Sequence, residues 1–552
     1  MSKHRRRKIQ VKKIETKPGI IQKYWPEITI LIIIIVIAII RYRLLNVPLE
    51  RDEGEYAYMG QLLLQGIPPY AEAYNMKFPG IYFIYALILA IFGQTHISIH
   101  LALLLTNAAT IFLIYLLGKN LFDSLIGILS GTGYGILSLS PYFHGLWANS
   151  EHYVVLFAVG GILLLIRSLH SNKGYLLFWS GILLGLSFTT KQHSILFILF
   201  SIGYFIFTYL KEGSHALSNF SKKLGLLILG IIIPAGLFLI TLAIGGVLER
   251  FWFWTFEYAS EYTSMISLEQ GILLLRITIS YGLQANLPIW IAAALGLASP
   301  LWDGKARSKW VFNVGFFLAS LIAFSLGFYF RYHYYILLCP SLALLSGIAI
   351  ASLIRKISWF PFQSMKIGVL IFAITIIYSY PLFAQRELLF QFTPSKICHK
   401  IFHFSNPFTE SLEIARYLKL NTSINDRIAV IGSEPQIYFY SQRRAATRYI
   451  YTYMLMESHP FALDMQKEMI QEVEAAKPKY LVFVDIPFSW LKTSKSNTLI
   501  FEWLKSYLIK HYEHIGIIDI LGYTQTYYLW GEKVKRYKPR SNYNLSVFKR
   551  RK

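Results

Sequence analysis

Long apolar runs separated by short polar connections occupy the chain from residue 26 to residue 385. Each run has roughly 17 to 25 residues, which is enough for a helix to cross a hydrocarbon core about 30 Å thick. The pattern therefore predicts a polytopic α-helical membrane protein. About eleven spans are expected, near residues 26–41, 97–117, 123–143, 153–169, 175–190, 192–209, 223–245, 275–299, 310–329, 333–353 and 366–385.

The pattern changes after residue 385, where charged, polar and apolar residues alternate over short distances. The segments "RIAVIG" and "KYLVFVDI" favour buried strands, whereas "IARYL" and "LDMQKEMIQEVEAAK" favour helices. We therefore predict a water-soluble α/β domain over residues 386–552. Its most unusual stretch is "GSEPQIYFYSQRRAATRYIY", whose arginines either stabilise the domain or guide a ligand towards a site.

Composition agrees with a membrane protein, because 55% of the 552 residues are hydrophobic and 15% are charged, against roughly 25% charged in an average soluble protein. The net charge of +24 does not indicate nucleic-acid binding, because the Lys and Arg residues gather in the two tails and in short loops. The two cysteines, Cys339 and Cys398, do not form a disulfide framework. The first apolar run is too long for a cleaved signal and should remain as an anchor.

The segment 80–94 decides the predicted topology. If this segment lies in the membrane interface, the basic connecting loops share the side of the basic N-terminal tail, whereas a crossing segment would reverse the positive-inside bias. We therefore predict an interfacial helix there. This topology gives a cytoplasmic tail (1–24), a membrane domain (25–385) with an outer loop at 42–96, and a domain (386–552) outside the inner membrane.

Acidic residues in the membrane part gather in the predicted outer segments, foremost in "LERDEGEYAYMGQ", residues 49–61. If this stretch is helical, Asp52 and Tyr56 share one face and "YMGQLLL" forms an apolar stripe suited to the bilayer surface. Gly66, Pro68 and Pro69 then end the helix. Lys77 follows in "MKFPG", and a carboxylate and a lysine at headgroup depth suit acceptor deprotonation and neutralisation of a leaving phosphate.

Each of these residues also has a plain structural interpretation. Carboxylates after a first helix commonly belong to a solvated loop, and Lys77 or Arg276 can extend towards the lipid surface as interface anchors. Arg331 can be an ordinary charge flanking a span, and His333 fits an aromatic belt better than a metal site. Their joint placement on one side of the membrane favours a site.

In these motifs the chain resembles the polyprenyl-phosphate-dependent glycosyltransferases of the GT-C superfamily. It is most similar to the bacterial branch (glycosyltransferase family 39) that includes the aminoarabinose transferase of lipid A and the relatives of protein O-mannosyltransferases. The matching segments, in chain order, are "RDEGEYAY", "MKFPG", "ANSEHYVVLF", "LSFTTKQ" and "RYHYYILLCPSLALL". The chain departs from related enzymes at Glu55, where Arg is frequent, at Phe78, where Pro is frequent, and at Glu151, where Asp is common.

The resemblance implies a GT-C fold and roles for nine residues. Asp52 would be the base, supported by Glu53 and Glu151. The donor phosphate would be bound by Lys77, Arg331, Arg276 and Lys191, and the substrate would be positioned by Tyr56 and Tyr335. No metal ligand is assigned, no cofactor is certain and the need for a divalent metal is open.

The function implied is transfer of a sugar, with inversion, from a polyprenyl-phosphate donor to a hydroxyl group of a lipid, glycan or protein acceptor on the outer face. Membrane lipids are expected partners, and nucleic acid is not. Two alternatives stay open at this point: a transporter or flippase of lipid-linked sugars, and a non-catalytic membrane scaffold or receptor. The largely apolar centres of the spans disfavour a polar path through the membrane.

Overall fold

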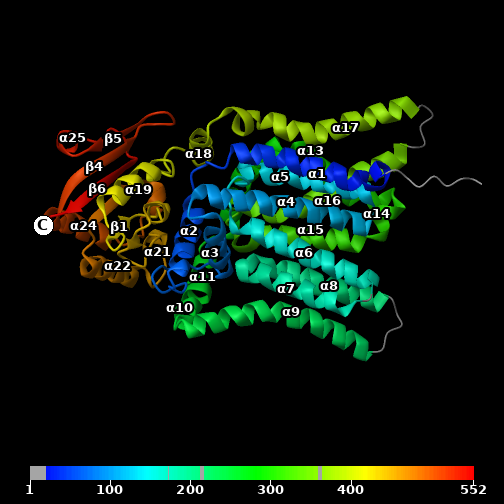
Figure 1. Cartoon of the computed structure of the whole chain (residues 1–552), viewed down its shortest axis with the longest axis horizontal. Coiled ribbons are helices and arrows are strands. Elements are labelled where there is room, and N and C mark those ends of the chain that lie inside the picture. Colours follow the sequence, from blue (N-terminus) through cyan, green and yellow to red (C-terminus); the bar gives the residue numbers. More distant parts are fainter. Residues whose placement is uncertain (1–19, 172, 212–216, 358–362, 552) are drawn as a thin grey trace, which may run out of the picture.

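The computed structural model of this chain describes residues 20–171, 173–211, 217–357 and 363–551. Most of the predicted basic tail, residues 1–19, therefore lies outside the described residues. The described chain forms a bundle of long helices and a smaller α/β part, and the α/β part lies at one end of the bundle (Figure 1).

Helices of the bundle occupy the predicted apolar runs. Seven of them, α1, α4, α6, α8, α9, α15 and α16, are long and apolar enough to cross a membrane, whereas α5, α7 and the described part of α17 are apolar but shorter. The bundle helices are α1 (Ile20–Arg43), α4 (His96–Leu121), α5 (Ser124–Leu139), α6 (Ser150–Ser171), α7 (Gly174–Thr190), α8 (Ile195–Lys211), α9 (Leu217–Ile244), α13 (Leu287–Ala298), α15 (Trp310–Ser325), α16 (Tyr335–Ile357) and α17 (Gln363–Ala384).

The predicted span 275–299 is long and apolar enough to cross a membrane, but it is not one straight helix. It is divided between α12 (Leu268–Ala285) and α13, whose axes differ by 98°. Pro288 lies in the first turn of α13, where its fixed φ favours a new helix start and its missing N–H removes a bond that a continuous helix would need. Helix α12 contacts η1 (Pro141–Phe143) and η5 (Leu326–Phe328) near the end of the bundle that carries the α/β part.

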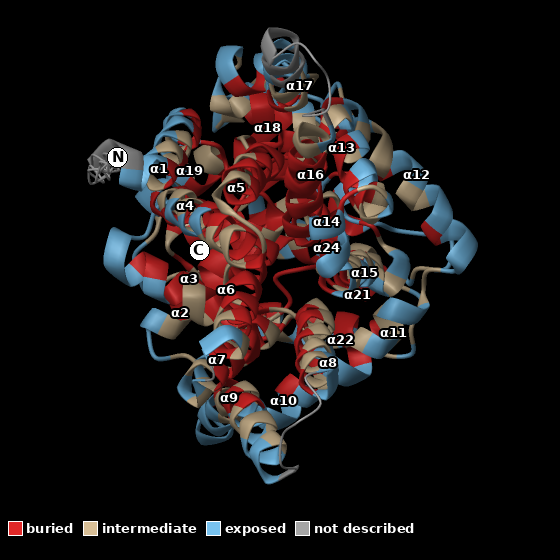
Figure 2. Cartoon of the chain, turned by 90° about the vertical axis from the view of Figure 1, so that its right-hand side faces the viewer, coloured by how far each residue is buried: buried red, intermediate tan, exposed pale blue. Residues whose placement is uncertain are grey.

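Helix α16 forms the centre of the bundle. In its most apolar stretch 94% of the residues are buried, compared with 22% in α1 and in α9. The end-on view shows this buried core around α16 and α5, with exposed positions on the peripheral helices α1, α9 and α12 (Figure 2). The peripheral helices expose apolar side chains such as Ile39 and Ile232, as expected for surfaces that face lipid.

Ion pairs hold the basic connections together at the end of the bundle remote from the α/β part. Lys119, at the end of α4, lies 2.5 Å from Glu27 of α1. Lys305 of the short helix α14 (Gly304–Ser308) lies 2.6 Å from Asp123, which caps the start of α5. Since α14 lies far from the α/β part (Figure 1), these basic loops and the start of α1 share one end of the molecule, as the charge pattern predicts.

Helices α2 (Arg51–Leu64) and α3 (Gly80–Phe92) lie between the bundle and the α/β part (Figure 1). Helix α3 has 13 residues, which reach about 20 Å and are too few to cross a bilayer core of about 30 Å. It buries one face and exposes Leu87 and Ile91. Both observations fit an interfacial helix better than a span.

Helix α2 starts with a capping box, in which the Glu50 side chain accepts the Glu53 N–H and the Glu53 side chain accepts the Glu50 N–H. It ends before Gly66, whose φ of 78° suits glycine. Most of its apolar stripe packs against protein, because Tyr58, Met59 and Leu62 are buried and the Tyr58 ring lies 5.2 Å from that of Tyr438 in the α/β part, whereas Leu64 at its end is exposed.

Close contact fixes α2 against the α/β part. A Cβ atom on Gly54 would lie 2.7 Å from the backbone nitrogen of Gln436, so only glycine permits this approach. A continuous hydrophobic core runs from Tyr56 and Tyr82 at the bundle end to Ile428 and Leu481 in the sheet. The two parts are therefore packed together and not merely connected by a linker.

The α/β part contains a mixed sheet with the strand order β2-β1-β3-β6-β4-β5. Strands β2, β1 and β3 are parallel, and β6, β4 and β5 are antiparallel to their neighbours. The predicted strands and helices correspond to β1, β3, α19 and α22. The strands are β1 (Arg427–Ile431), β2 (Arg444–Ala445), β3 (Tyr480–Asp485), β4 (Tyr512–Ile520), β5 (Thr526–Trp530) and β6 (Asn544–Arg550); the helices are α18 (Pro394–Phe402), α19 (Glu410–Asn421), α20 (Gln436–Ser441), α21 (Tyr453–Met456), α22 (Ala462–Ala476), α23 (Pro487–Trp490), α24 (Leu499–His511) and α25 (Glu532–Lys535).

Candidate functional site

A cavity of about 420 Å³ lies where the bundle meets the α/β part. Its lining combines the start of α2, the loop before α3, the loops before α6 and α16, the end of α7, and the segment 451–457 of the α/β part. Residues that matter below are Asp52, Lys77, Lys191, Arg331, Tyr451 and Glu457. A single cavity thus collects side chains that are far apart in the sequence.

One ammonium group at this cavity bridges two carboxylates. Lys77 Nζ lies 2.8 Å from Asp52 Oδ1 and 2.9 Å from Glu55 Oε2. The same nitrogen lies 4.5 Å from the centre of the Tyr56 ring, which adds a cation–π contact. Asp52 reaches the cavity, whereas Glu55 is fully buried behind it. Helical spacing in α2 therefore places the two carboxylates on either side of Lys77.

The two carboxylates have opposite pKa shifts. Burial opposes ionisation of Asp52, but attraction to Lys77 and hydrogen bonds from Lys77 and Tyr451 outweigh it, so the pKa of Asp52 lies well below its ordinary value. Burial is the stronger influence on Glu55 and raises its pKa to about 7, although Lys77 and Tyr82 oppose the rise. Near neutral pH Asp52 is therefore a carboxylate, and Glu55 is close to its midpoint.

Glu53 points away from the cavity. Its carboxylate lies 3.0 Å from His100 Nε2 and accepts the backbone N–H of Ala148. It is fully buried and also closes the capping box of α2. Glu53 therefore fixes the start of α2 against α4 and the loop before α6, and it does not line the cavity.

Glu151 and Lys191 form a second ion pair beside the first. Glu151, at the start of α6, is fully buried and accepts a hydrogen bond from Lys191 Nζ. The Lys191 nitrogen lies 4.3 Å from the centre of the Tyr334 ring, and His333 Nε2 lies 3.8 Å from the Glu151 carboxylate. This pair joins the ends of α6, α7 and η6 (Tyr332–Tyr334) at the cavity wall.

The change Lys191→Met should destabilise the protein by about 3–5 kcal/mol, because it leaves a buried carboxylate without its cation. The thermal unfolding of the purified protein in detergent would measure this loss, and the double change with Glu151→Gln should recover most of it. Lys305→Met is the matched control, because its pair with Asp123 is 42% and 33% exposed and should contribute less than about 1 kcal/mol. Equal effects of the two lysine changes would contradict the assignment.

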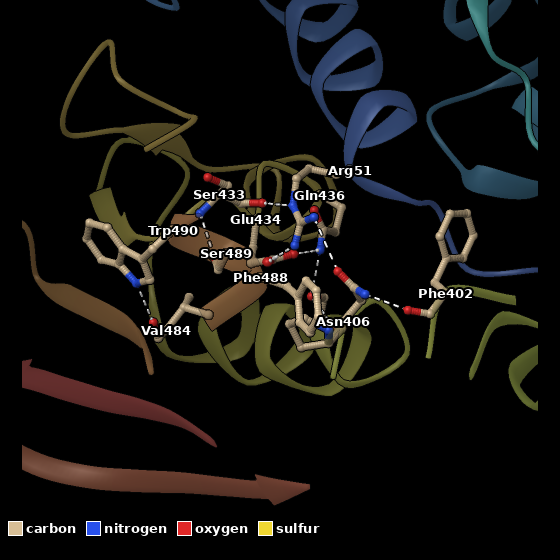
Figure 3. Close-up of polar contacts among 12 residues, drawn as sticks. Arg51, Phe402, Asn406, Ser433, Glu434, Gln436, Val484, Phe488, Ser489 and Trp490 are labelled. Atoms are coloured by element: carbon tan, nitrogen blue, oxygen red, sulfur yellow. Dashed lines mark hydrogen bonds and ion pairs between the residues drawn. The ribbon is translucent and has the colours of Figure 1, made fainter. Parts of the chain in front are cut away.

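Arg51, directly before Asp52, anchors the start of α2 in the α/β part (Figure 3). Its Nε donates to the Ser433 carbonyl at 2.5 Å, and one terminal nitrogen lies 2.6 Å from Glu434 Oε1. The other terminal nitrogen lies 3.3 Å from Asn406 Oδ1. Glu434 is fully buried, so this ion pair is shielded from water and holds the adjacent Asp52 at the cavity edge.

The α/β part presents the carboxyl ends of its parallel strands to the cavity. Ser433 follows β1, and Phe488 and Leu491, which line the cavity, follow β3. Ligands of α/β sheets commonly bind at this edge. Tyr451 donates a hydrogen bond to Asp52 Oδ1 at 2.8 Å, so the α/β part contacts the first carboxylate directly.

The sequence did not identify the contributions of the α/β part. Tyr451, Tyr453 and Glu457 line the cavity, but they are about four hundred positions from Asp52 and have no motif spacing to it. The only signal was the unusual stretch that ends in "RYIY". Its arginines do not reach the cavity: Arg443 binds backbone carbonyls, Arg444 lies near Glu72, and Arg448 pairs with Glu468 and Glu472.

The remaining predicted site residues, Arg331, Arg276 and Tyr335, differ in their position relative to the cavity. Arg331 lines the cavity, and among the described residues it forms no ion pair, although its guanidinium lies 5.3 Å from the Tyr329 ring centre. Arg276 is exposed on α12 and does not line the cavity. Tyr335 is buried with its ring stacked on Phe143 at 4.9 Å, whereas its neighbours in η6 line the cavity.

The geometry supplies a base, cations and aromatic walls. Within the described ranges no group of three or more His, Cys, Asp or Glu residues is placed to hold a metal ion. The chemistry that the side chains themselves support is proton acceptance at Asp52 and binding of an anion at Lys77 and Arg331.

The chain has the GT-C fold, which it shares with solved structures of ArnT and of an archaeal oligosaccharyltransferase. Part of its sequence agrees: residues 76–238 match the family described as dolichyl-phosphate-mannose-protein mannosyltransferase. The matched range includes Lys77, Glu151 and Lys191. No curated protein matches the chain significantly in sequence.

Similar solved structures cover nearly the whole chain. ArnT from Cupriavidus metallidurans bound to undecaprenyl phosphate has a TM-score of 0.59 at 11% identity, over 95% of this chain and 98% of that one. The same enzyme in the apo state has a TM-score of 0.55 at 12% identity, over 94% and 97%. The apo oligosaccharyltransferase of Archaeoglobus fulgidus has a TM-score of 0.52 at 11% identity, over 97% and 77%. At these identities the likeness establishes the fold.

Proposed function

We propose that this protein is a membrane glycosyltransferase that transfers one sugar from a polyprenyl-phosphate donor to a hydroxyl acceptor. The observation that carries the proposal is the contact of Asp52 and Lys77 in one cavity that the α/β part helps to line. Two comparisons support the donor class: one similar structure is bound to undecaprenyl phosphate, and the matched family is described by dolichyl-phosphate-mannose.

In this mechanism Asp52 accepts the proton of the acceptor hydroxyl group. The acceptor oxygen attacks the anomeric carbon, the bond from that carbon to the phosphate oxygen breaks, and its electron pair leaves with the polyprenyl phosphate. A single displacement of this kind inverts the anomeric carbon. Lys77 and Arg331 neutralise the departing phosphate, and the Glu151–Lys191 pair supports the wall beside them.

Lys77 connects donor binding to proton acceptance, because the same ammonium group serves the donor phosphate and the Asp52 carboxylate. The Lys77 ammonium lies 2.8 Å from the Asp52 carboxylate and stabilises it, which makes Asp52 a weak base. When Lys77 also binds the phosphate, its positive charge is shared with that anion, so Asp52 is stabilised less and becomes more basic. Proton acceptance is thereby favoured when the donor phosphate is in place.

The proposed location of the cavity is the outer face of the cytoplasmic membrane. Support comes from the basic connections, which lie at the opposite end of the bundle and by the positive-inside rule belong to the cytoplasm. The N-terminus is then cytoplasmic and the α/β part is extra-cytoplasmic. A lipid, glycan or protein hydroxyl group would reach Asp52 from that side, and the polyprenyl chain would approach from the bilayer.

The direct test is incubation of the purified protein in proteoliposomes with a panel of polyprenyl-phosphate sugars and envelope acceptors. The proposal expects release of polyprenyl phosphate together with a glycosylated acceptor. Movement of the lipid-linked sugar across the bilayer without sugar transfer would instead identify a flippase. Binding of a partner without either reaction would identify a scaffold.

The change Tyr451→Phe tests the contribution of the α/β part. It removes the hydrogen bond to Asp52, and a hydrogen bond to a charged group contributes about 1.5–3 kcal/mol. Turnover should therefore fall about tenfold or more, with unfolding temperature unchanged. Tyr528→Phe, on strand β5 and 38% exposed, is the matched control. Wild-type turnover of the Tyr451 variant would show that the α/β part does not position Asp52.

A further inference from the structure

Glu55 shares its cation with a second carboxylate. Its Oε2 accepts a hydrogen bond from Lys77 Nζ at 2.9 Å, and its Oε1 accepts one from the Tyr82 hydroxyl at 2.8 Å. In the described part of the chain, Lys77 is the only cation within 4 Å of either Asp52 or Glu55. Both carboxylates therefore depend on one ammonium group, and Glu55 is the one that water does not reach.

The charge of this cluster conflicts with donor binding. With both carboxylates ionised, Asp52, Glu55 and Lys77 carry a net charge of about −1, and an anionic phosphate would have to compete with both for the ammonium group. With Glu55 neutral, the net charge is about zero and Lys77 can turn to the phosphate. A proton on Glu55 therefore removes the obstacle without altering Asp52, which must stay ionised to act as the base.

The tyrosines and the lysine that face Glu55 keep their protons near neutral pH. Tyr56 of α2, Tyr70 of the following loop, Tyr82 of α3 and Tyr451 of the α/β part all have pKa values well above the ordinary tyrosine value, because burial disfavours their ionised form. Burial lowers the pKa of Lys77, but the two carboxylates more than reverse this effect and raise it. The cluster also faces Glu50, whose pKa burial raises well above its ordinary value, and, across the cavity, His333, Arg331, Glu151 and Lys191.

We propose that Glu55 takes up one proton from solvent when the donor phosphate binds to Lys77, so that donor binding is coupled to protonation of this carboxyl group. The inference rests on the proposed function. Lys77 keeps its protons and exchanges its Glu55 contact for a phosphate oxygen, while Glu55 becomes a neutral carboxylic acid. Glu55 is thus a positioning residue, which acts on the donor through Lys77 and does not touch the reacting atoms.

The sign of the pH dependence follows from this exchange. Burial raises the pKa of Glu55 to about 7, so below that pH the proton is already present and donor affinity should be constant. Above pH 7 each bound donor must bring in one proton, and affinity should fall about tenfold per pH unit.

A suitable probe is methyl undecaprenyl phosphate, a phosphodiester with one methyl and one undecaprenyl group. Its phosphate keeps a single negative charge throughout this pH range. Its dissociation constant would be measured for the full-length protein in nanodiscs from pH 6 to pH 8.5. Calorimetry at pH 8 in two buffers with different ionisation enthalpies would count the protons taken up, and close to one is expected. This second measurement needs no variant and so does not depend on the folding of a mutant.

The variant Glu55→Gln should bind the probe with the same affinity at every pH, about tenfold more tightly than the wild type at pH 8, and without proton uptake. Glu72→Gln, at an acidic side chain that contacts Arg427 outside the cavity, should keep the wild-type pH dependence. His333→Asn should also keep it, because the proton is assigned to Glu55.

Two results would overturn the inference and leave the proposed function standing: probe binding by the wild type that does not vary with pH, or a Glu55→Gln variant that still takes up a proton. Failure of the wild type to bind the probe at any pH would overturn the proposed function and the inference with it. The two failures are therefore distinguishable.

Discussion

Asp52→Asn lowers the rate of sugar transfer by about 100- to 10,000-fold, the range expected when a general base is removed. Asparagine has nearly the same shape, but its amide cannot accept the proton of the acceptor hydroxyl group. The measurement is the initial rate of polyprenyl phosphate release by the purified variant, with the donor sugar that the wild type uses best.

The control for this prediction is the unfolding temperature, which should change little because Asp52 is only partly buried and Lys77 keeps Glu55 as a partner. Asp303→Asn would not be a suitable comparison, because Asp303 pairs with Arg355 at the remote end of the bundle and supports the fold there. Turnover close to that of the wild type would exclude Asp52 as the base.

Lys77→Met should lower kcat/KM for the donor by about 100- to 1,000-fold, which is the usual loss when one group that stabilises a developing anion is removed. Methionine retains the apolar stem beside Tyr56 but removes the charge that the leaving phosphate needs. Donor dependence of the initial rate would measure the effect. The change also leaves Asp52 and Glu55 without a cation, so both carboxylates should take up protons more readily.

Lys305→Met is the matched control for the second prediction, because it removes a lysine from an ion pair of similar length at the opposite end of the bundle. Its donor kinetics should equal those of the wild type. If Lys77→Met keeps the wild-type KM and kcat for the donor, Lys77 is not part of the phosphate site.

The membrane part was largely predictable because crossing a bilayer imposes a minimum apolar length on each helix. The bend within residues 275–299 was not predicted, because average hydropathy does not register a local break such as the new helix start at Pro288. The burial of Tyr58 was also missed. An apolar helix face can be covered by lipid or by protein, and the sequence pattern is the same in both cases. Here the α/β part covers it.

At the site, the sequence brought Asp52 and Lys77 together, because they lie in one loop region and have chemistry that suits a common substrate. It assigned Glu53 to the catalytic group, whereas Glu55 is the carboxylate that contacts Lys77. Side chains two positions apart on a helix point in very different directions. In the packed structure Glu53 contacts His100, whereas Glu55 contacts Lys77. The sequence likewise predicts Tyr335 for the site, but the turn of η6 places Tyr334 at the cavity and leaves Tyr335 buried against Phe143.

The packing of α2 on the α/β part has a consequence for engineering. Exchange of the C-terminal part between related chains is an obvious route to a new acceptor, but here the recipient surface includes Arg51, Gly54 and Tyr58 on the helix that carries Asp52. A transplanted part that lacks partners for these residues would leave a buried cation unpaired and shift the base. Grafts should therefore carry α2 with the C-terminal part as one exchangeable unit.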